Sequence, residues 1–245
     1  MTDKARLSSA IDVVISRQQD SGKPLAIVLA GHNGSGKSTL WYEHLANKLQ
    51  IPLINADRMM LSILPDAPLP GWAVSLRDKD EAWMGVAQKG VQSFVAQAMA
   101  QGVPFATETV FSHWQENPDG TVSSKVDTIQ ALQKAGYFVL LIFVGLGNVS
   151  LSMARVSSRK ADGGHNVEMN KLKQRFPRTQ KAIRMALPLT DAAILADNSL
   201  DLKRAFSVVR IQMGGHIIFD TRREDAPSAL IQEWMHAVCG PAAAS

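Results

Sequence analysis

The sequence contains one cysteine, Cys239, and no long apolar run. A single cysteine cannot form an internal disulfide framework, so the chain suits a reducing compartment. The longest apolar run, Tyr137 to Val144, is far shorter than the roughly 18 residues of a membrane span. The residues that follow Met1 show neither the apolar segment nor the cleavage site of a secretory signal. We therefore expect a cytoplasmic location and no insertion into a membrane.

Strong charge of either sign is also lacking. The formal net charge is +4, which suits an anionic small ligand but is too weak by itself to indicate nucleic acid. The hydrophobic content of 46% is enough for a sizeable core. We expect a single domain over residues 1–245.

The most informative stretch fits the pattern Gly-x-x-x-x-Gly-Lys-Ser/Thr, a phosphate-binding loop, or P-loop. An apolar strand-like run precedes it and helical spacing follows it, which is the context that the motif requires and that a chance glycine-rich turn lacks. The predicted nucleotide-binding residues are Gly31, His32, Asn33, Gly34, Ser35, Gly36, Lys37, Ser38 and Thr39.

These residue types suit a triphosphate. Glycines let successive backbone N–H groups point at phosphate oxygens, and the helix that follows adds its positive end. Lys37 is expected to reach the β- and γ-phosphates of ATP, and the Ser38 hydroxyl is expected to bind Mg²⁺. The side chain of His32 is assigned no role, because this position varies freely in such loops.

Strand-like and helical segments alternate along the chain, which predicts an α/β fold. We expect a three-layer α/β/α sandwich of the P-loop NTPase and kinase type, with a mostly parallel sheet and a helical lid. The expected parallel strands are 25–30, 51–57, 103–107, 137–144 and 191–197. A hairpin over 206–211 and 216–219 and a helix over 227–238 form a C-terminal extension at about 205–240. The other expected helices are 5–18, 40–49, 79–101, 125–134, 149–159 and 167–186, the last bent or interrupted at Pro177.

Three acidic residues follow apolar strand-like runs: Asp57, Glu108 and Asp197. In parallel sheets the carboxyl ends of the strands carry the binding site. Asp57 can face the γ-phosphate and accept a proton from a substrate hydroxyl; the alternative is a helix N-cap, and the two roles are compatible. Glu108 can orient substrate or hold Mg²⁺ through water, and the alternative is a solvated strand end.

Basic residues cluster in a segment at about 155–180, which we expect to be the lid. Arg155 and Arg159 share one helical face, where like charges repel unless an anion lies between them. Lys171, Arg175 and Arg178 form a second basic stripe, and a short glycine-containing loop joins the two groups. Lids that close over transferring phosphoryl groups have this composition. A solvated basic face is the alternative.

Two further features are missing. The strand at 137–144 ends in Gly145-Leu146-Gly147, with no acidic residue of the Walker-B kind, and the chain has no Leu-Ser-Gly-Gly-Gln run. Both absences favour a small kinase over a motor or transport ATPase.

Taken together, the motifs resemble those of the zeta-toxin family of P-loop kinases, in particular its short, single-domain bacterial branch. The resemblance extends over about Ala26 to Ser199. It is carried by Gly31 to Thr39, Ile54-Asn55-Ala56-Asp57, Ala106-Thr107-Glu108-Thr109, Arg155-Val156 with Arg159, Gly163 to Val167, Arg175-Phe176-Pro177-Arg178, and Ala196-Asp197-Asn198-Ser199.

This resemblance implies an ATP-dependent kinase, with Mg²⁺, that phosphorylates a hydroxyl of a nucleotide sugar such as UDP-N-acetylglucosamine. It implies Asp57 as the base, Glu108 and Thr109 as substrate-binding residues, and Arg155 and Arg159 as phosphate clamps, with Lys37 in the P-loop. Asp197 and Asn198 would flank the adenine end, and residues Leu61 to Trp83 would supply the sugar pocket. An antitoxin is a possible protein partner.

Two alternatives remain open at this point. The acceptor could be another hydroxyl, such as that of a nucleoside, a dinucleotide or an RNA end, although the weak net charge speaks against RNA. The chain could also be a nucleotide-binding regulatory module without transfer activity, for which the base or a lid arginine should be missing; neither is.

Overall fold

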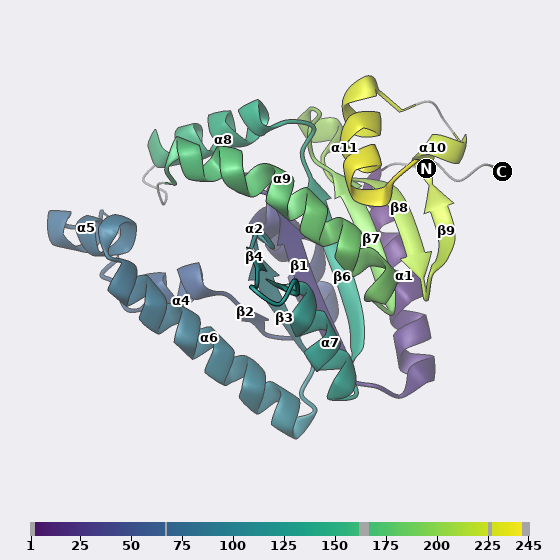
Figure 1. The fold of residues 1–245 in the computed structure, drawn as a ribbon, viewed down its shortest axis with the longest axis horizontal. Coiled ribbons are helices and arrows are strands. Elements are labelled where there is room, and N and C mark those ends of the chain that lie inside the picture. The colour runs from purple at the N-terminus through teal and green to yellow at the C-terminus, as the bar shows by residue number, and fades with distance from the viewer. Residues whose placement is uncertain (1–2, 67, 162–166, 225–226, 242–245) are drawn as a thin grey trace.

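The chain folds around a seven-stranded sheet with the strand order β2-β3-β1-β6-β7-β8-β9, seen in a computed structural model (Figure 1). The structure describes residues 3–66, 68–161, 167–224 and 227–241. The first five strands in this order are parallel; β8 then pairs antiparallel with β7, and β9 pairs antiparallel with β8. The sheet strands are β1 (Leu25–Gly31), β2 (Leu53–Ile54), β3 (Phe105–Thr109), β6 (Phe138–Gly145), β7 (Ala192–Asp197), β8 (Ser207–Met213) and β9 (His216–Asp220).

The two central strands are apolar and fully buried. β1 and β6 pair in parallel from Leu25↔Phe138 to Gly31↔Val144, and each residue of both strands is buried. Strands that are covered on both faces need apolar side chains pointing both ways, which explains the unbroken apolar runs. This rigid centre sets the position of the loop that leaves β1 at its carboxyl end.

Helices cover both faces of the sheet. One core cluster joins the sheet to α6, α7, α9 and α11, and a second joins the opposite face to α1 and the helix that follows the P-loop (Figure 1). The three-layer α/β/α sandwich is therefore confirmed. The longer helices are α1 (Asp3–Ser21), α5 (Gly71–Lys79), α6 (Glu81–Gln101), α7 (Val126–Lys134), α8 (Val149–Ala161), α9 (Met169–Ala186) and α11 (Ala229–Cys239).

Short elements fill the remaining connections. The P-loop helix is continuous but changes its winding: α2 (Lys37–Leu40) passes into a π-helical turn η1 (Trp41–Leu45) and then α3 (Ala46–Leu49). The other short elements are α4 (Ala56–Ser62), the hairpin β4 (Trp114–Glu116) and β5 (Val122–Ser124), η2 (Leu187–Leu189), η3 (Leu202–Arg204) and α10 (Thr221–Glu224).

Several predicted elements differ from those in the structure. The strand expected over 51–57 spans only Leu53–Ile54, because Asn55 caps a helix there and Asp57 lies in the first turn of α4. Helix α5 and the β4–β5 hairpin were not predicted. Pro177 lies inside α9, which continues as one helix through it.

The C-terminal part of α9, at and beyond the end of the expected lid of residues 155–180, is built into the main body. Residues Thr179, Ala182, Ile183 and Ala186 of α9 are fully buried, and the last three belong to the core under the sheet. The Thr179 hydroxyl also donates a hydrogen bond to the Val110 carbonyl at 3.0 Å. The glycine-containing loop at Gly163, Gly164 and His165 lies outside the described residues. Among the described helices, none has the length and apolar composition needed to cross a membrane.

Candidate active site

The P-loop joins β1 to α2 and curls where the sequence predicts. Gly34 and Gly36 have φ values of 70° and 89°, which side chains other than glycine rarely tolerate. A Cβ atom at Gly34 would also lie 3.1 Å from Cβ of Arg155 and 3.2 Å from the Ser152 carbonyl oxygen. The loop is therefore packed closely against α8, and glycine is required there for space as well as for conformation.

Lys37 lies at the centre of the site and is 8% exposed. Its ammonium group donates to the carbonyl oxygens of Gly31, at 3.2 Å, and His32, at 3.1 Å. Burial lowers the pKa of Lys37, the carboxylates of Glu108 and Asp57 act to raise it, and Arg159 lowers it further. Asp57, Glu108 and Arg159 therefore all lie within electrostatic reach of the P-loop lysine.

Glu108 connects three elements at the mouth of the P-loop. Both of its carboxylate oxygens accept from the Ser38 hydroxyl at 3.1 Å, and one lies 3.9 Å from the Lys37 ammonium. The Asn55 amide donates to Glu108 at 2.8 Å. Glu108 is the fourth residue of β3, paired with Leu29 of the neighbouring β1, and this register brings it beside the P-loop.

Asp57 is exposed in the first turn of α4. The N-cap of this helix is Asn55, whose side chain accepts from the Arg58 backbone N–H at 3.1 Å. The capping alternative for Asp57 is therefore excluded, and its carboxylate remains available to a substrate.

The Ser38 and Glu108 oxygens fit a magnesium ion. Mg²⁺ prefers hard oxygen ligands and is usually held by one or two protein groups, water and substrate phosphates. The hydroxyl and carboxylate already face one another at the loop mouth. Within the described residues no group of three or more His, Cys, Asp and Glu side chains could hold a metal by itself, which is compatible with a site that phosphate oxygens complete.

The Asp197 side chain is buried and does not line the mouth of the P-loop. It is 0% exposed, and its carboxylate accepts from the Trp234 indole N–H at 2.9 Å and from the hydroxyl and backbone N–H of Ser199. The implied contact of this side chain with adenine is therefore corrected, because no carboxylate atom reaches the surface. The next residue, Asn198, donates its side-chain amide to the Ser35 carbonyl at 2.9 Å.

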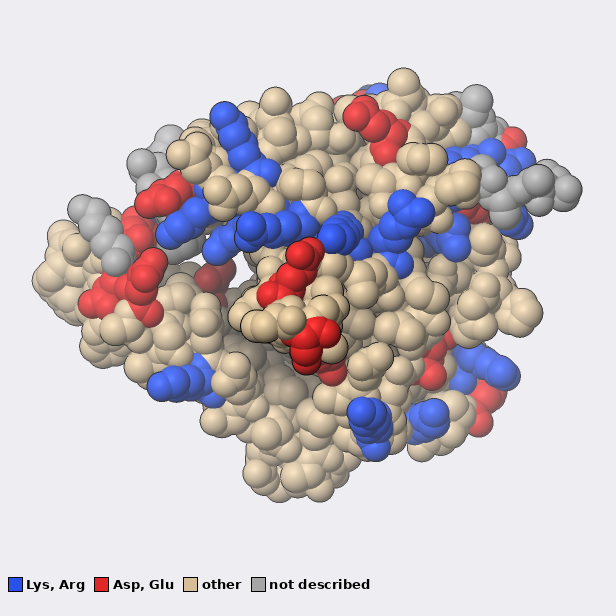
Figure 2. Space-filling view, viewed as in Figure 1, with Lys and Arg blue, Asp and Glu red and all other residues tan. Residues whose placement is uncertain are grey.

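The basic residues expected in the lid differ in their burial and in their distance from the P-loop. Arg155 is half-buried beside the P-loop; burial lowers its pKa, while the Asp197 carboxylate acts to raise it. Arg159 is exposed one turn further along α8. The basic stripe of α9 lies on its exposed side, and Figure 2 shows a row of Lys and Arg side chains across the position that α9 occupies in Figure 1. Its first member, Lys171, lies 3.7 Å from Glu81 of α6.

Thr109 closes β3 and is partly buried. Its hydroxyl accepts a hydrogen bond from the backbone N–H of Phe111 at 3.1 Å, which fixes the turn after the strand. The hydroxyl proton is not used by this bond, so Thr109 keeps one donor for a ligand.

A model of the zeta toxin family matches residues 11–199 of the sequence, more than three-quarters of the chain. The chain belongs to the zeta toxin family. The matched region of this zeta toxin family member includes the P-loop, Asp57, Glu108, both lid arginines and Asn198. Strands β8 and β9 and helix α11 lie beyond it.

The zeta toxin family member is also similar to other known proteins. An uncharacterized protein of Haemophilus influenzae is 28% identical over 151 residues, which cover 62% of this chain and 91% of that protein. The structure of the PezAT chromosomal toxin–antitoxin system of Streptococcus pneumoniae gives a TM-score of 0.52 at 17% identity, covering 96% of this chain and 89% of that one. The AvrRxo1-ORF1:AvrRxo1-ORF2 structure with sulphate ions gives 0.60 at 13% identity, covering 99% and 72%. At these identities the structural matches show the shared fold.

Several residues that shape the zeta toxin family site were not singled out from the sequence. Asn55 was not assigned a role, although an Asn at the start of an apolar helix is a recognisable N-cap signal. Ser152, whose hydroxyl donates to the Asn33 carbonyl at 2.7 Å, and Trp234 carry no local signal, because their partners are distant in sequence. The structure also shows a stack between His32 and Phe176.

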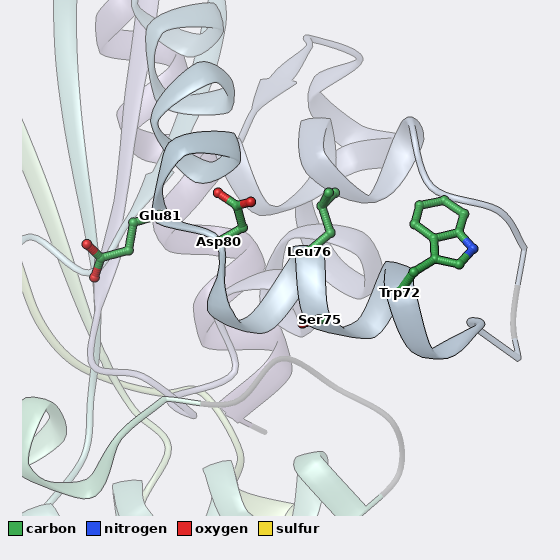
Figure 3. Close-up of a pocket in the computed structure, with 5 residues that line it drawn as sticks. All are labelled: Trp72, Ser75, Leu76, Asp80 and Glu81. Atoms are coloured by element: carbon green, nitrogen blue, oxygen red, sulfur yellow. The ribbon is translucent and has the colours of Figure 1, made fainter.

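A cavity of about 740 Å³ lies beside α5 and the start of α6. Its lining residues are Trp72, Ser75, Leu76, Asp80 and Glu81, all within the span Leu61 to Trp83 that the family resemblance linked to a sugar pocket. Figure 3 shows Trp72, Leu76 and Asp80 projecting from one side of this stretch, while Glu81 points away from them. The Lys171–Glu81 ion pair places the beginning of α9 next to the cavity.

Proposed function

We propose that this protein is an ATP-dependent phosphotransferase that moves the γ-phosphate of ATP to a hydroxyl group of a small molecule. The observation that carries the proposal is the convergence on Lys37: two carboxylates from separate elements and an arginine of α8 lie close enough to alter its pKa. Phosphoryl transfer depends on such a concentration of positioned charge. Membership of the zeta toxin family supports it, and so does the related fold of AvrRxo1-ORF1:-ORF2, a structure of which contains ATP.

In this proposal Asp57 is the general base. The acceptor oxygen attacks the γ-phosphorus, its proton passes to the Asp57 carboxylate, and the bond between the γ-phosphorus and the β,γ-bridging oxygen breaks to leave ADP. Asp57 suits this role because it is exposed and lies within electrostatic reach of Lys37. The P-loop amides from Gly31 to Thr39 and Lys37 hold the phosphates. Arg155 and Arg159 neutralise charge on the transferring group.

Ser38 and Glu108 would hold Mg²⁺ beside the phosphates. The bound ion would neutralise charge on the β- and γ-phosphate oxygens. Glu108 and Thr109 are proposed to bind the acceptor, which Thr109 could orient through its remaining hydroxyl donor. Asn198 holds the P-loop through Ser35.

The first acceptor to test is a nucleotide sugar such as UDP-N-acetylglucosamine. The cavity beside α5 combines an indole, an aliphatic side chain and carboxylates, the residue types that bind the faces and hydroxyl groups of sugars. PezAT is a toxin–antitoxin system, and on that basis we include an antitoxin as a candidate protein partner.

A metabolite extract incubated with the protein and ATP tests the proposal directly. We expect one or more metabolites to gain about 80 Da, the mass of one HPO₃ unit, with formation of ADP. UDP-N-acetylglucosamine, nucleosides, dinucleotides and an RNA with a free 5′-hydroxyl should be supplied separately as acceptors. ATP binding without any phosphorylated product across this panel would contradict transfer and indicate a nucleotide-binding module.

A further inference from the structure

The side chain of His32 is buried inside the P-loop. It is 2% exposed, and within the part of the chain that the structure describes neither ring nitrogen has a hydrogen-bond partner. Burial, reinforced by the nearby Lys37 charge, lowers its pKa to about 3, so the ring is neutral at physiological pH. An imidazole in this state interacts with its surroundings through the faces and edges of the ring.

Two aromatic side chains enclose this ring. Phe176 of α9 stacks on it with a centroid distance of 3.8 Å and an interplanar angle of 11°. Phe143 of β6 meets it edge to face at 5.6 Å and in turn contacts Trp234 of α11 at 5.8 Å. The P-loop is therefore joined by ring contacts to the central strand and to two helices of one sheet face.

The backbone of the same residue holds the P-loop lysine. The His32 carbonyl oxygen accepts from the Lys37 ammonium at 3.1 Å and from the Ser35 backbone N–H at 3.1 Å. The stacked ring restrains the residue that carries this oxygen, so loss of the stack would leave the backbone of His32 less restrained. The Lys37 amine depends on that backbone for one of its two acceptors.

Helix α9 provides a fixed support for the stack. Thr179, one turn after Phe176, is fully buried and bonded to the Val110 carbonyl, and Ala182 and Ile183 pack in the core. Phe176 therefore projects from an anchored part of the helix.

We propose that His32 is a positioning residue, whose stack on Phe176 fixes the P-loop against α9 and thereby places the Lys37 amine for the nucleotide phosphates. This inference rests on the proposed function, because it assigns His32 a role in ATP binding at that site. It requires the ring faces and does not require the ring nitrogens. Simple core packing would also bury the ring, but it would affect stability without affecting the affinity of the folded protein for ATP.

Three variants distinguish the two roles. His32→Ala removes the ring, and His32→Phe keeps an aromatic face at the same position. Phe105→Leu is the control, since Phe105 is a buried aromatic whose ring contact, with Tyr137, involves no P-loop residue. The dissociation constant for ATP with Mg²⁺ is measured by calorimetry, and the unfolding midpoint of each variant is measured in urea.

We expect His32→Ala to weaken ATP binding by about tenfold or more, a shift of about 1.4 kcal/mol. His32→Phe should restore the affinity to within about threefold of the original protein, or less than about 0.7 kcal/mol. Phe105→Leu should lower the unfolding midpoint without changing the ATP affinity. Unchanged affinity in folded His32→Ala, or a loss in His32→Phe as large as in His32→Ala, would overturn the inference.

A variant on the other side of the stack covers the case in which His32→Ala does not fold. Phe176→Leu keeps an apolar side chain but removes the stack, and it should weaken ATP binding in the same direction. Where both single variants fold, the double variant should bind ATP no more weakly than His32→Ala alone, because one contact is removed in each case. Additive losses, or full affinity in Phe176→Leu, would contradict the coupling. Failure of the unmodified protein to bind ATP would instead reject the proposed function.

Discussion

Glu108 is the residue at which the P-loop, the start of α4 and strand β3 meet. Its carboxylate binds the Ser38 hydroxyl and the Asn55 amide and faces the Lys37 ammonium. A carboxylate held by two hydrogen-bond donors and a neighbouring ammonium group keeps its orientation before any ligand arrives. We infer that Glu108 prepares the side of the site where Mg²⁺ and the acceptor are proposed to meet.

Replacement of this carboxylate tests that role. Glu108→Gln keeps the size of the side chain but removes the negative charge, so transfer should fall by about 100-fold or more, as for loss of one preorganised electrostatic group. The Mg²⁺ concentration needed for half-maximal activity should rise. Both are measured from initial rates of ADP formation over a magnesium titration.

The matched control is Glu116→Gln. Glu116 is an exposed carboxylate on β4 whose contacts are with Lys181 and the Trp114 indole, away from the P-loop. It should retain full activity and the original magnesium dependence. Equal losses in the two variants would show that the effect is one of general charge and would count against a specific role for Glu108.

At this scale the sequence predicts the positions of the candidate site residues better than those of the residues that support them. Asp57 and Glu108 could be found because each follows an apolar strand-like run, and the ends of parallel strands share one edge of the sheet. The placement of Asp197 in the core could not be found, because its partner Trp234 lies 37 residues away. The sequence alone does not distinguish a structural, buried carboxylate from one that faces a binding site, because the difference lies in their hydrogen-bond partners.

Helix α11 is an element of support for the nucleotide site, although it lies beyond the family match. Its Trp234 ring fills the space over Gly145, where an added Cβ would lie 2.8 Å from ring atoms. The same ring donates to Asp197 next to Asn198, which holds the P-loop through Ser35. The end of the chain is therefore connected to the site through a short series of contacts.

A change in this helix should lower stability. Trp234→Phe removes one donor from a fully buried carboxylate and leaves a small cavity, so the free energy of unfolding should fall by about 2 to 4 kcal/mol. The measurement is urea unfolding followed by circular dichroism. Trp72→Phe is the control, because Trp72 is 61% exposed, and its effect should stay within about 0.5 kcal/mol. Equal stability of the two variants would argue against the Trp234–Asp197 contact.

The long apolar elements follow from the sequence, and the short ones do not. Strand β6 and helix α6 have enough residues for their periodicity to be read. Strand β2 has two residues, and the β4–β5 hairpin has three in each strand, so neither contains a full repeat of a pattern. Helix α5 was missed because only one of its described residues is buried, and polar and apolar side chains mix on its faces.

On the scale of the whole molecule, the candidate site residues lie together at one edge of the sheet. β1, β2 and β3 deliver the P-loop, the Asp57 turn and Glu108 to that edge, and α8 and α9 cross above it (Figure 1). Helices α5 and α6 extend to one side, and Figure 2 shows a hollow between this part and the main body, bordered by basic side chains.

The central claim is that Asp57 takes the proton of an acceptor hydroxyl beside a nucleotide held by the P-loop. The most direct test compares the Asp57→Asn variant with the original protein in two measurements, ATP affinity by calorimetry and the rate of phosphoryl transfer to the identified acceptor. The account predicts near-normal ATP affinity and a transfer rate lower by about 100-fold or more, the range for loss of a positioned base. An Asp57→Asn variant that transfers phosphate at the original rate would contradict it.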